Sequence, residues 1–235
     1  MKISACLIVK NEKDHIRDVL SSLTGVDEIV VCDTGSVDET VELARAFTDK
    51  VFTDYTWQDD FAAARNHALS KCTGDWVLSI DGDEVLEDGG IAKIRKIIES
   101  ARVDQSQFSV EMTHTSTGQK HNLPRIFRND GSVRWLGAAH ETLSPPQRNL
   151  TDVVVVYGYS TAHALDPDRM LRILAKLVNS DEGTPRDLYY YAREFWYRRD
   201  FVNAERLFNE YVTISTYAAE KADALLYQAR CLFIL

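Results

Sequence analysis

The chain has 235 residues, with 27 Lys and Arg against 36 Asp and Glu, and a formal net charge of -9. This acidic balance argues against nucleic acid or an anionic lipid surface as the partner, because phosphate contacts need clustered basic side chains. The longest apolar stretch, residues 153–157, is far too short to span a bilayer.

The cysteines and the first residues indicate the compartment. The four cysteines are scattered without a Cys-x-x-Cys spacing, which favours buried small hydrophobic side chains over a disulfide framework or a zinc site. Met1 and Lys2 lead directly into an apolar run, without the pattern of a signal peptide. We therefore expect a soluble, cytoplasmic protein with no membrane span.

Strand and helix patterns alternate over the first hundred residues. Apolar runs predict buried strands at residues 3–9, 29–32, 51–52 and 76–80. Apolar side chains at helical spacing predict helices near residues 16–23, 41–47, 61–69 and 91–98. The second of these helices is expected to begin with a capping box between Ser36 and Glu39. The alternation predicts an α/β fold with a mostly parallel, Rossmann-like sheet and right-handed crossovers.

The pattern changes in the remainder of the chain. Short strands and turns are expected between residues 108 and 159, and helices from Pro167 onward. Ala192 and Ala229 lie 37 positions apart in similar surroundings, which suggests tetratricopeptide-like hairpins with an incomplete second unit. A plain helical extension is the alternative. The expected domains are residues 1–165 and 166–235.

Two carboxylates separated by one residue follow the fourth predicted strand. Asp81 and Asp83, in the sequence Asp-Gly-Asp-Glu, project from the end of the run at residues 76–80. Like charges this close are unfavourable unless a cation lies between them, and oxygen ligands favour Mg²⁺ or Mn²⁺. A solvated acidic turn is the alternative interpretation of this Asp-x-Asp (DxD) motif.

Four segments in this order resemble the family 2 glycosyltransferases, which have the GT-A fold. The segments are residues 3–12, 29–40, 60–69 and 76–84. The resemblance implies a metal-dependent, inverting hexosyltransferase that uses a nucleotide sugar, UDP-linked, and an acceptor that is a glycan, a lipid-linked sugar or a peptide side chain. Many relatives carry two acidic residues where this chain has Asp33 and Thr34.

The resemblance also implies roles for individual residues. Asp83, Asp81 and the late His163 are the expected ligands of Mn²⁺ or Mg²⁺, although a lone histidine is often an ordinary surface residue. Glu141, which follows His140, is the expected catalytic base, and a structural salt bridge from Glu141 to Arg134 is the alternative.

The donor is expected to bind at the carboxyl ends of the strands. Asn11 and Glu12 follow the first strand and Asp33 ends the second, so these residues, with Asp81, are expected to line the crevice for base and ribose. Arg65 is expected near the base and phosphates, where its fixed positive charge suits either.

Two other classes of protein compete with this interpretation. A nucleotidyltransferase would carry a Gly-rich basic loop after the first strand, where this chain has Lys10, Asn11 and Glu12. A non-catalytic binding or scaffold protein would combine a degenerate GT-A domain with a peptide-binding helical tail. The apolar last helix is expected to be covered by its own domain, by further chain or by a second copy in a homodimer.

Overall fold

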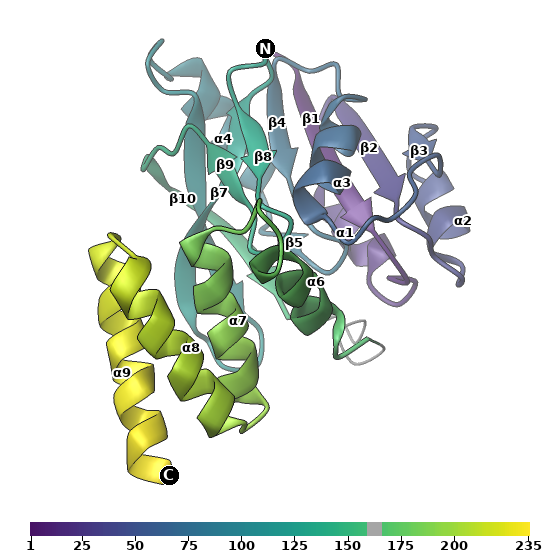
Figure 1. Ribbon diagram of the computed structural model, residues 1–235. Helices are drawn as coiled ribbons and strands as arrows, with labels where there is room; N and C mark the ends of the chain where they lie inside the picture. Colours follow the sequence, from purple (N-terminus) through teal and green to yellow (C-terminus); the bar gives the residue numbers. More distant parts are fainter. Residues whose placement is uncertain (159–165) are drawn as a thin grey trace. The chain divides into compact units, whose positions relative to one another are not determined.

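The computed structural model describes residues 1–158 and 166–235, and Figure 1 shows the arrangement of the elements. The predicted ligand His163 lies outside the described residues. The chain divides into two compact units, residues 1–137 with 141–165 and residues 138–140 with 166–235, which are described separately.

Unit 1 is an α/β unit built on a central sheet. Its eight strands follow the order β3-β2-β1-β4-β7-β6-β10-β5 in the described part of the chain. The strands of this sheet are β1 (Ile3–Val9), β2 (Glu28–Asp33), β3 (Val51–Phe52), β4 (Trp76–Ser79), β5 (Val85–Leu86), β6 (Gln107–His114), β7 (Lys120–Arg128) and β10 (Leu150–Tyr157). A separate antiparallel hairpin is formed by β8 (Arg134–Leu136) and β9 (Thr142–Ser144).

The sheet is parallel in its N-terminal half and mixed overall. β3, β2, β1 and β4 pair in parallel, as the alternation of strands and helices predicts. β7 then runs antiparallel between β4 and β6, while β10 is parallel to β6 and antiparallel to β5. The predicted α/β fold is confirmed, although the antiparallel strands make the sheet less parallel than expected.

Side chains on the two faces of the sheet enter two different cores. Along β1, Leu7 and its alternate neighbours pack with α1 (Ile16–Ser22) and α4 (Gly90–Glu99), whereas Cys6 faces the other side. That second core contains residues from α3 (Phe61–Leu69) and from the β8–β9 hairpin. This period-two alternation explains why α3 and the hairpin share one face of the sheet.

The start of α2 (Thr40–Arg45) differs from the predicted capping box. Glu39 occupies the N-cap position and makes no side-chain cap hydrogen bond. Ser36 instead accepts a hydrogen bond from the backbone N–H of Asn11 at 2.9 Å, and its own N–H donates to Asp33. The hydroxyl is used to join two loops, so the helix begins later than the motif suggests.

Unit 2 is helical. Its helices among the described residues are α6 (Arg169–Val178), α7 (Pro185–Tyr197), α8 (Phe201–Ile214) and α9 (Ala218–Ile234). A capping box forms here, between Thr184 and Asp187, and Asp200 caps α8. A core of aromatic and small side chains from α7, α8 and α9 holds the unit together. None of the helices in the described ranges is long and apolar enough to cross a membrane.

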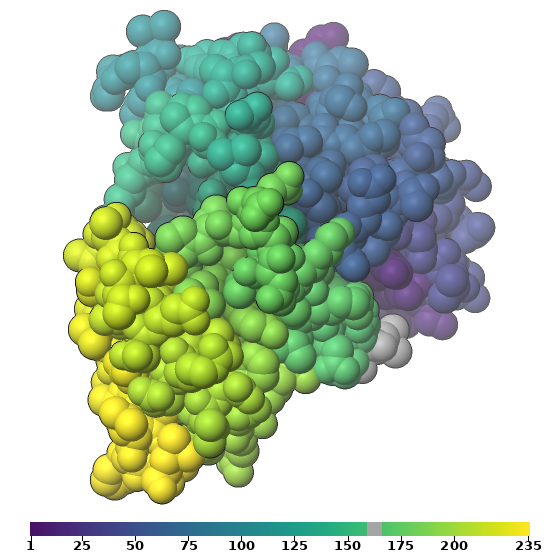
Figure 2. All heavy atoms as spheres, viewed as in Figure 1, coloured from purple at the N-terminus to yellow at the C-terminus, as the bar shows by residue number. Residues whose placement is uncertain are grey.

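The end of α9 exposes apolar side chains. This part of the chain, yellow in Figure 2, lies at the surface of unit 2. The exposed members, led by Phe233 at 92% exposure, are Leu225, Leu226, Leu232, Phe233, Ile234 and Leu235. Such a group is unusual on a soluble monomer, so a covering partner remains an expectation.

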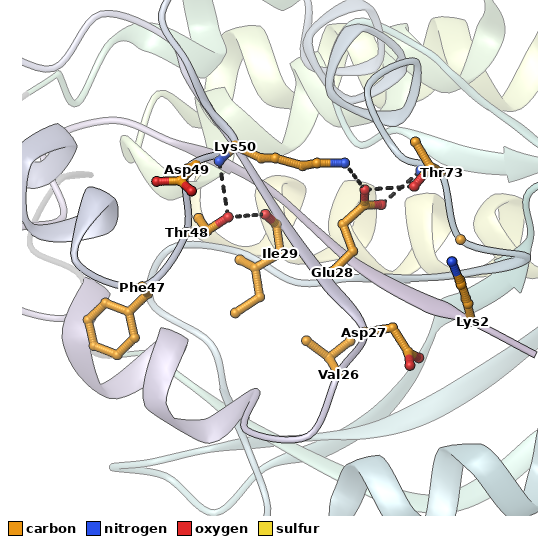
Figure 3. A pocket seen from close by; sticks show the side chains of 11 residues that line it. Lys2, Val26, Asp27, Glu28, Ile29, Phe47, Thr48, Asp49, Lys50 and Thr73 are labelled. Atoms are coloured by element: carbon orange, nitrogen blue, oxygen red, sulfur yellow. Dashed lines mark hydrogen bonds and ion pairs between the residues drawn. The ribbon is translucent and has the colours of Figure 1, made fainter.

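A cavity of about 620 Å³ lies at the amino ends of the first strands (Figure 3). Its central acid is Glu28, the first residue of β2, which accepts hydrogen bonds from Lys50, from Ser4 and from the backbone and hydroxyl of Thr73. Burial acts to raise the pKa of Glu28, but these donors outweigh it and lower the pKa from 4.5 to about 2. Glu28 therefore fastens β1, β2 and the segments before β3 and β4 at one point.

We expect Glu28→Gln to lower the free energy of unfolding by roughly 2–3 kcal/mol at pH 7, because the folded state holds the ionised acid through those donors. A pKa that is lower in the folded protein stabilises it above about pH 4.5, and this stability is lost as the pH falls toward 2. Urea unfolding at pH 7 and pH 3 measures the effect. Glu99→Gln, at an exposed position at the end of α4, is the control. An equal deficit at both pH values would contradict the assignment.

Candidate functional site

The predicted site residues follow adjacent parallel strands. Asn11 and Glu12 come after β1, Asp33 ends β2, and Asp81 and Asp83 come after β4. Since β2, β1 and β4 are neighbours in the sheet, their carboxyl ends bring these side chains to one edge. The cavity of Figure 3 lies at the opposite edge.

Arg65 is the centre of the site. It projects from α3, which begins after Asp60, whose carboxylate accepts from the N–H of Ala63 at 2.8 Å. Arg65 is 7% exposed, and its Nη1 and Nη2 donate to the two carboxylate oxygens of Asp81 at 2.6 and 3.1 Å. Its Nε donates to Oε1 of Glu141 at 2.6 Å. One guanidinium group thus joins the DxD turn to the expected base.

A second buried arginine approaches Asp81 from the other side. Arg125 on β7 donates through Nη2 to Oδ2 of Asp81 at 3.0 Å and to Oε1 of Glu84. Glu84 also accepts, through Oε2, from the backbone N–H of Asp81 at 2.8 Å. Asp81 is therefore held by three donor atoms from two guanidinium groups.

The electrostatics of the cluster differ between its two inner acids. Burial acts to raise the pKa of Asp81, but Arg65 and Arg125 outweigh it and hold that pKa well below the ordinary value. Burial raises the pKa of Glu84 to about 8, and the nearby Asp81 carboxylate adds to the increase against the opposing effect of Arg125. Asp81 is thus ionised at neutral pH, which suits its contact with two cations.

Glu141 is carried by a loop that is fixed to α3. Asn66, next to Arg65, donates through Nδ2 to the carbonyl of Trp135 at 2.9 Å and accepts from its N–H at 3.0 Å. The guanidinium of Arg65 also lies 5.0 Å from the centre of the Trp135 ring. The salt bridge that Glu141 makes with the described residues is to Arg65, not to Arg134 as the structural alternative supposed.

The glycine of the DxD motif allows a close approach. A Cβ atom added to Gly82 would lie 2.7 Å from Cγ of Glu12 and 3.3 Å from a methyl carbon of Val9. Glu12 is buried, and its backbone N–H donates to Thr40 at 2.7 Å. Any other residue at position 82 would displace the Glu12 side chain, so the two segments are fitted to each other.

Two further predicted residues shape the loops. Asp33 is buried and accepts hydrogen bonds from the N–H groups of Gly35 and Ser36 at 3.0 Å. Asn11 has a positive φ of 57° and accepts from the N–H of Val37 at 2.8 Å. The Asn11 side chain thus joins the loops after β1 and β2, whereas the Asp33 side chain bonds within its own loop. Asp38, interpreted from the sequence as structural, accepts from Thr40.

The structure thus joins Arg65, Asp81 and Glu141 directly and brings Glu12 against the DxD turn. Sequence reasoning missed Arg125 and Glu84. A signal for Arg125 was present, because its charge lies directly before the apolar pair Ile126 and Phe127, and a charged side chain must find a partner when buried. Glu84 has no such signal in its local sequence.

The donor chemistry at this edge fits a hard divalent cation, since Asp83 offers carboxylate oxygen. No group of three or more His, Cys, Asp or Glu side chains among residues 1–158 and 166–235 is placed to hold a metal ion. The oxygens of Asp81 are engaged by Arg65 and Arg125.

Comparison with known proteins identifies the type of fold and the family. The fold of the chain is the GT-A type of α/β fold, shared with S. aureus TarS in complex with UDP-GlcNAc at a TM-score of 0.56 and 14% identity, over 90% of this chain and 81% of that one. The fold is also similar to that of glucosyl-3-phosphoglycerate synthase from Mycobacterium tuberculosis in complex with Mg²⁺ and uridine diphosphate. The TM-score is 0.51 and the identity 16%, over 75% of this chain and 78% of that one. The glycosyl transferase family 2 model matches residues 4–158, and the chain belongs to this family.

Two curated relatives extend the comparison. A TPR repeat-containing protein of Synechococcus elongatus is 37% identical over 147 residues, which are 60% of this chain and 35% of that protein. The prophage-derived glycosyltransferase SunS of Bacillus subtilis is 27% identical over 209 residues, 82% of this chain and 49% of SunS. The chain therefore spans between a third and a half of the length of these relatives.

Proposed function

We propose that this chain is a metal-dependent, inverting glycosyltransferase that transfers a hexose from a UDP-linked sugar. The observation that carries the proposal is the joining of Asp81 to Glu141 by Arg65 at the carboxyl edge of β4. A site that neutralises a diphosphate and holds a carboxylate beside it contains the two groups that sugar transfer requires. The UDP compounds and Mg²⁺ present in the two structural neighbours support the choice of donor.

Metal binding is assigned to Asp83, with His163 as a second ligand and Asp81 as a further one. A divalent ion bound there, Mn²⁺ or Mg²⁺, would stabilise the negative charge that develops on the diphosphate. Asp81 holds Arg65 and Arg125 in this structure, and binding a metal as well would require giving up one of those contacts.

Glu141 is proposed as the general base. Its carboxylate takes the proton of the acceptor hydroxyl as that oxygen attacks the anomeric carbon from the face opposite the diphosphate. The new carbon–oxygen bond forms, the bond to the diphosphate breaks, and UDP leaves with the electron pair. Attack from the opposite face inverts the anomeric configuration.

The residues at the ends of β1 and β2 are proposed to bind the nucleoside. Asn11, Glu12 and Asp33 surround the edge where a base and ribose would lie, and carboxylates accept hydrogen bonds from ribose hydroxyls. Arg65 and Arg125 place two buried positive charges behind Asp81. These charges balance the acids of the site before any phosphate is bound.

Incubation with UDP-glucose, UDP-galactose and UDP-N-acetylglucosamine, with and without Mn²⁺, tests the proposal. We expect Mn²⁺-dependent release of UDP from one donor, and loss of that release in Glu141→Gln. Release of pyrophosphate from a nucleoside triphosphate would instead identify a nucleotidyltransferase. UDP binding without turnover on any acceptor would favour a non-catalytic protein with a binding tail.

The acceptor class is a glycan, a lipid-linked sugar or a peptide side chain. The helical unit 2 is proposed as a tetratricopeptide-like extension, in keeping with the Synechococcus relative named for TPR repeats. Tyr189, Tyr190 and Tyr227 belong to its aromatic core, and they stabilise the helices whichever acceptor is used.

We expect the chain to form a homodimer through the exposed apolar end of α9, since two copies would cover each other's side chains. Phe233→Glu should shift the mass measured by size-exclusion light scattering from dimer to monomer. Val103→Glu is the matched control, because Val103 is 95% exposed but lies in unit 1. A monomeric wild-type chain at high concentration would rule out this interface.

A further inference from the structure

The two buried arginines of the site are bonded in different ways. Arg65 donates from three nitrogen atoms, Nε to Glu141 and both terminal nitrogens to Asp81. The side-chain hydrogen bonds of Arg125 to described residues come from Nη2, which donates to Asp81 and to Glu84. Nε of Arg125 is buried with no hydrogen-bond partner in the described part of the chain.

These contacts form a chain in which acidic side chains alternate with arginines. We call the sequence Glu84–Arg125–Asp81–Arg65–Glu141 the charge chain; each link is a salt bridge. Its members come from the turn after β4, from β7, from α3 and from the loop before β9. Glu84, whose pKa is raised to about 8, accepts from Arg125 chiefly as a neutral acid at pH 7. The two arginines therefore serve Asp81 and Glu141, and removal of Arg125 leaves Arg65 alone to compensate for both.

We propose that Arg125 is a positioning residue, which acts through Asp81 and Arg65 to hold the carboxylate of Glu141. This inference rests on the proposed function of Glu141 as the base. Without Arg125, the Asp81 carboxylate draws Arg65 toward itself, because no other cation of the charge chain remains to balance it. Glu141 then loses the guanidinium that orients it, although Arg125 itself does not touch Glu141.

The bonding pattern predicts different outcomes for the same substitution at the two arginines. Arg125→Lys should retain most of the function, because one ammonium nitrogen carries three donors and can serve both acids, and the buried unpaired Nε disappears. Arg65→Lys should lose the function, since one ammonium nitrogen cannot reach both Asp81 and Glu141 as the three nitrogens of the guanidinium do. Arg125→Met should lose the function that Arg125→Lys retains.

The first test is a double-mutant cycle on stability, which does not depend on the reaction. Arg125→Met and Glu141→Gln should each move the urea midpoint. The shift caused by Arg125→Met should be smaller in the Glu141→Gln background, where Arg65 no longer has a charge at position 141 to balance. Additive shifts would overturn the inference. If Arg125→Met does not fold, the double variant Arg125→Met/Glu84→Gln takes its place in the cycle, because it also removes the acid that would be left buried without a partner.

The second test measures transfer from the UDP-sugar that the wild-type chain uses. Arg125→Met should lower kcat about tenfold or more while donor KM stays within about threefold, and it should have no further effect in Glu141→Gln. A kcat close to that of the wild type in Arg125→Lys, but not in Arg65→Lys, supports the inference. An equal loss of kcat in the two lysine variants overturns it. If the wild-type chain used no donor, the proposed function would fail, and the stability cycle would still decide whether the charge chain couples these residues.

Discussion

Replacing Asp83 by alanine should abolish the Mn²⁺ dependence of UDP binding. Asp83 supplies the second carboxylate of the DxD turn, whereas the salt bridges to Arg65 and Arg125 are made by Asp81. A divalent cation held by Asp83 would stabilise the charge of the diphosphate by several kcal/mol. At about 1.4 kcal/mol per factor of ten, UDP affinity in the presence of Mn²⁺ should fall by about two orders of magnitude.

Isothermal titration calorimetry with UDP, with and without Mn²⁺, measures this effect. Asp88→Ala is the matched control, because Asp88 is an exposed aspartate a few residues farther along the same segment. The control should bind UDP as the wild type does. Unchanged Mn²⁺-dependent affinity in Asp83→Ala would show that the metal, if one is used, is held elsewhere.

Glu141→Gln should retain donor binding and lose transfer by about a hundredfold or more. The amide keeps the shape of the side chain and can still accept the hydrogen bond from Arg65, but it cannot take a proton from the acceptor. The loss should appear in kcat with donor KM little changed, because the substitution removes an interaction needed in the transition state.

Initial rates with the donor that supports UDP release, together with calorimetric UDP affinity, separate the two effects. Glu99→Gln provides the control for an exposed glutamate. Transfer within a few-fold of wild type would mean that the ion pair of Glu141 with Arg65 is structural and that a different carboxylate removes the proton. Weaker UDP binding with normal kcat would place Glu141 in the donor site instead.

The local sequence determined the strands and the residues at their ends. Continuous apolar runs in β1 and β4 identify buried strands, and acids that follow such strands reach a common edge because parallel strands place their carboxyl ends together. These rules depend on neighbours in the sequence. For that reason the amino-acid sequence is sufficient to propose Asp81, Asp83 and Glu12 as site residues.

Local rules failed where a side chain had a partner distant in the sequence. The capping box at Ser36 was wrong because the hydroxyl pairs with the loop after β1, 25 residues away. The order of β7 in the sheet, antiparallel between β4 and β6, also depends on long-range pairing. In both cases the competing contact lies outside the window that a sequence pattern covers.

The tertiary structure alone decided how the charges of the site are shared. The sequence identified Arg65, Asp81 and Glu141 as separate candidates, but the salt bridges that join them span 16 and 76 residues. Arg125 enters the same cluster from a strand 44 residues beyond Asp81. Burial makes an unpaired charge costly, so the fold must match each acid with a cation, and only the packing of α3, β7 and the hairpin loop determines which cation each acid receives.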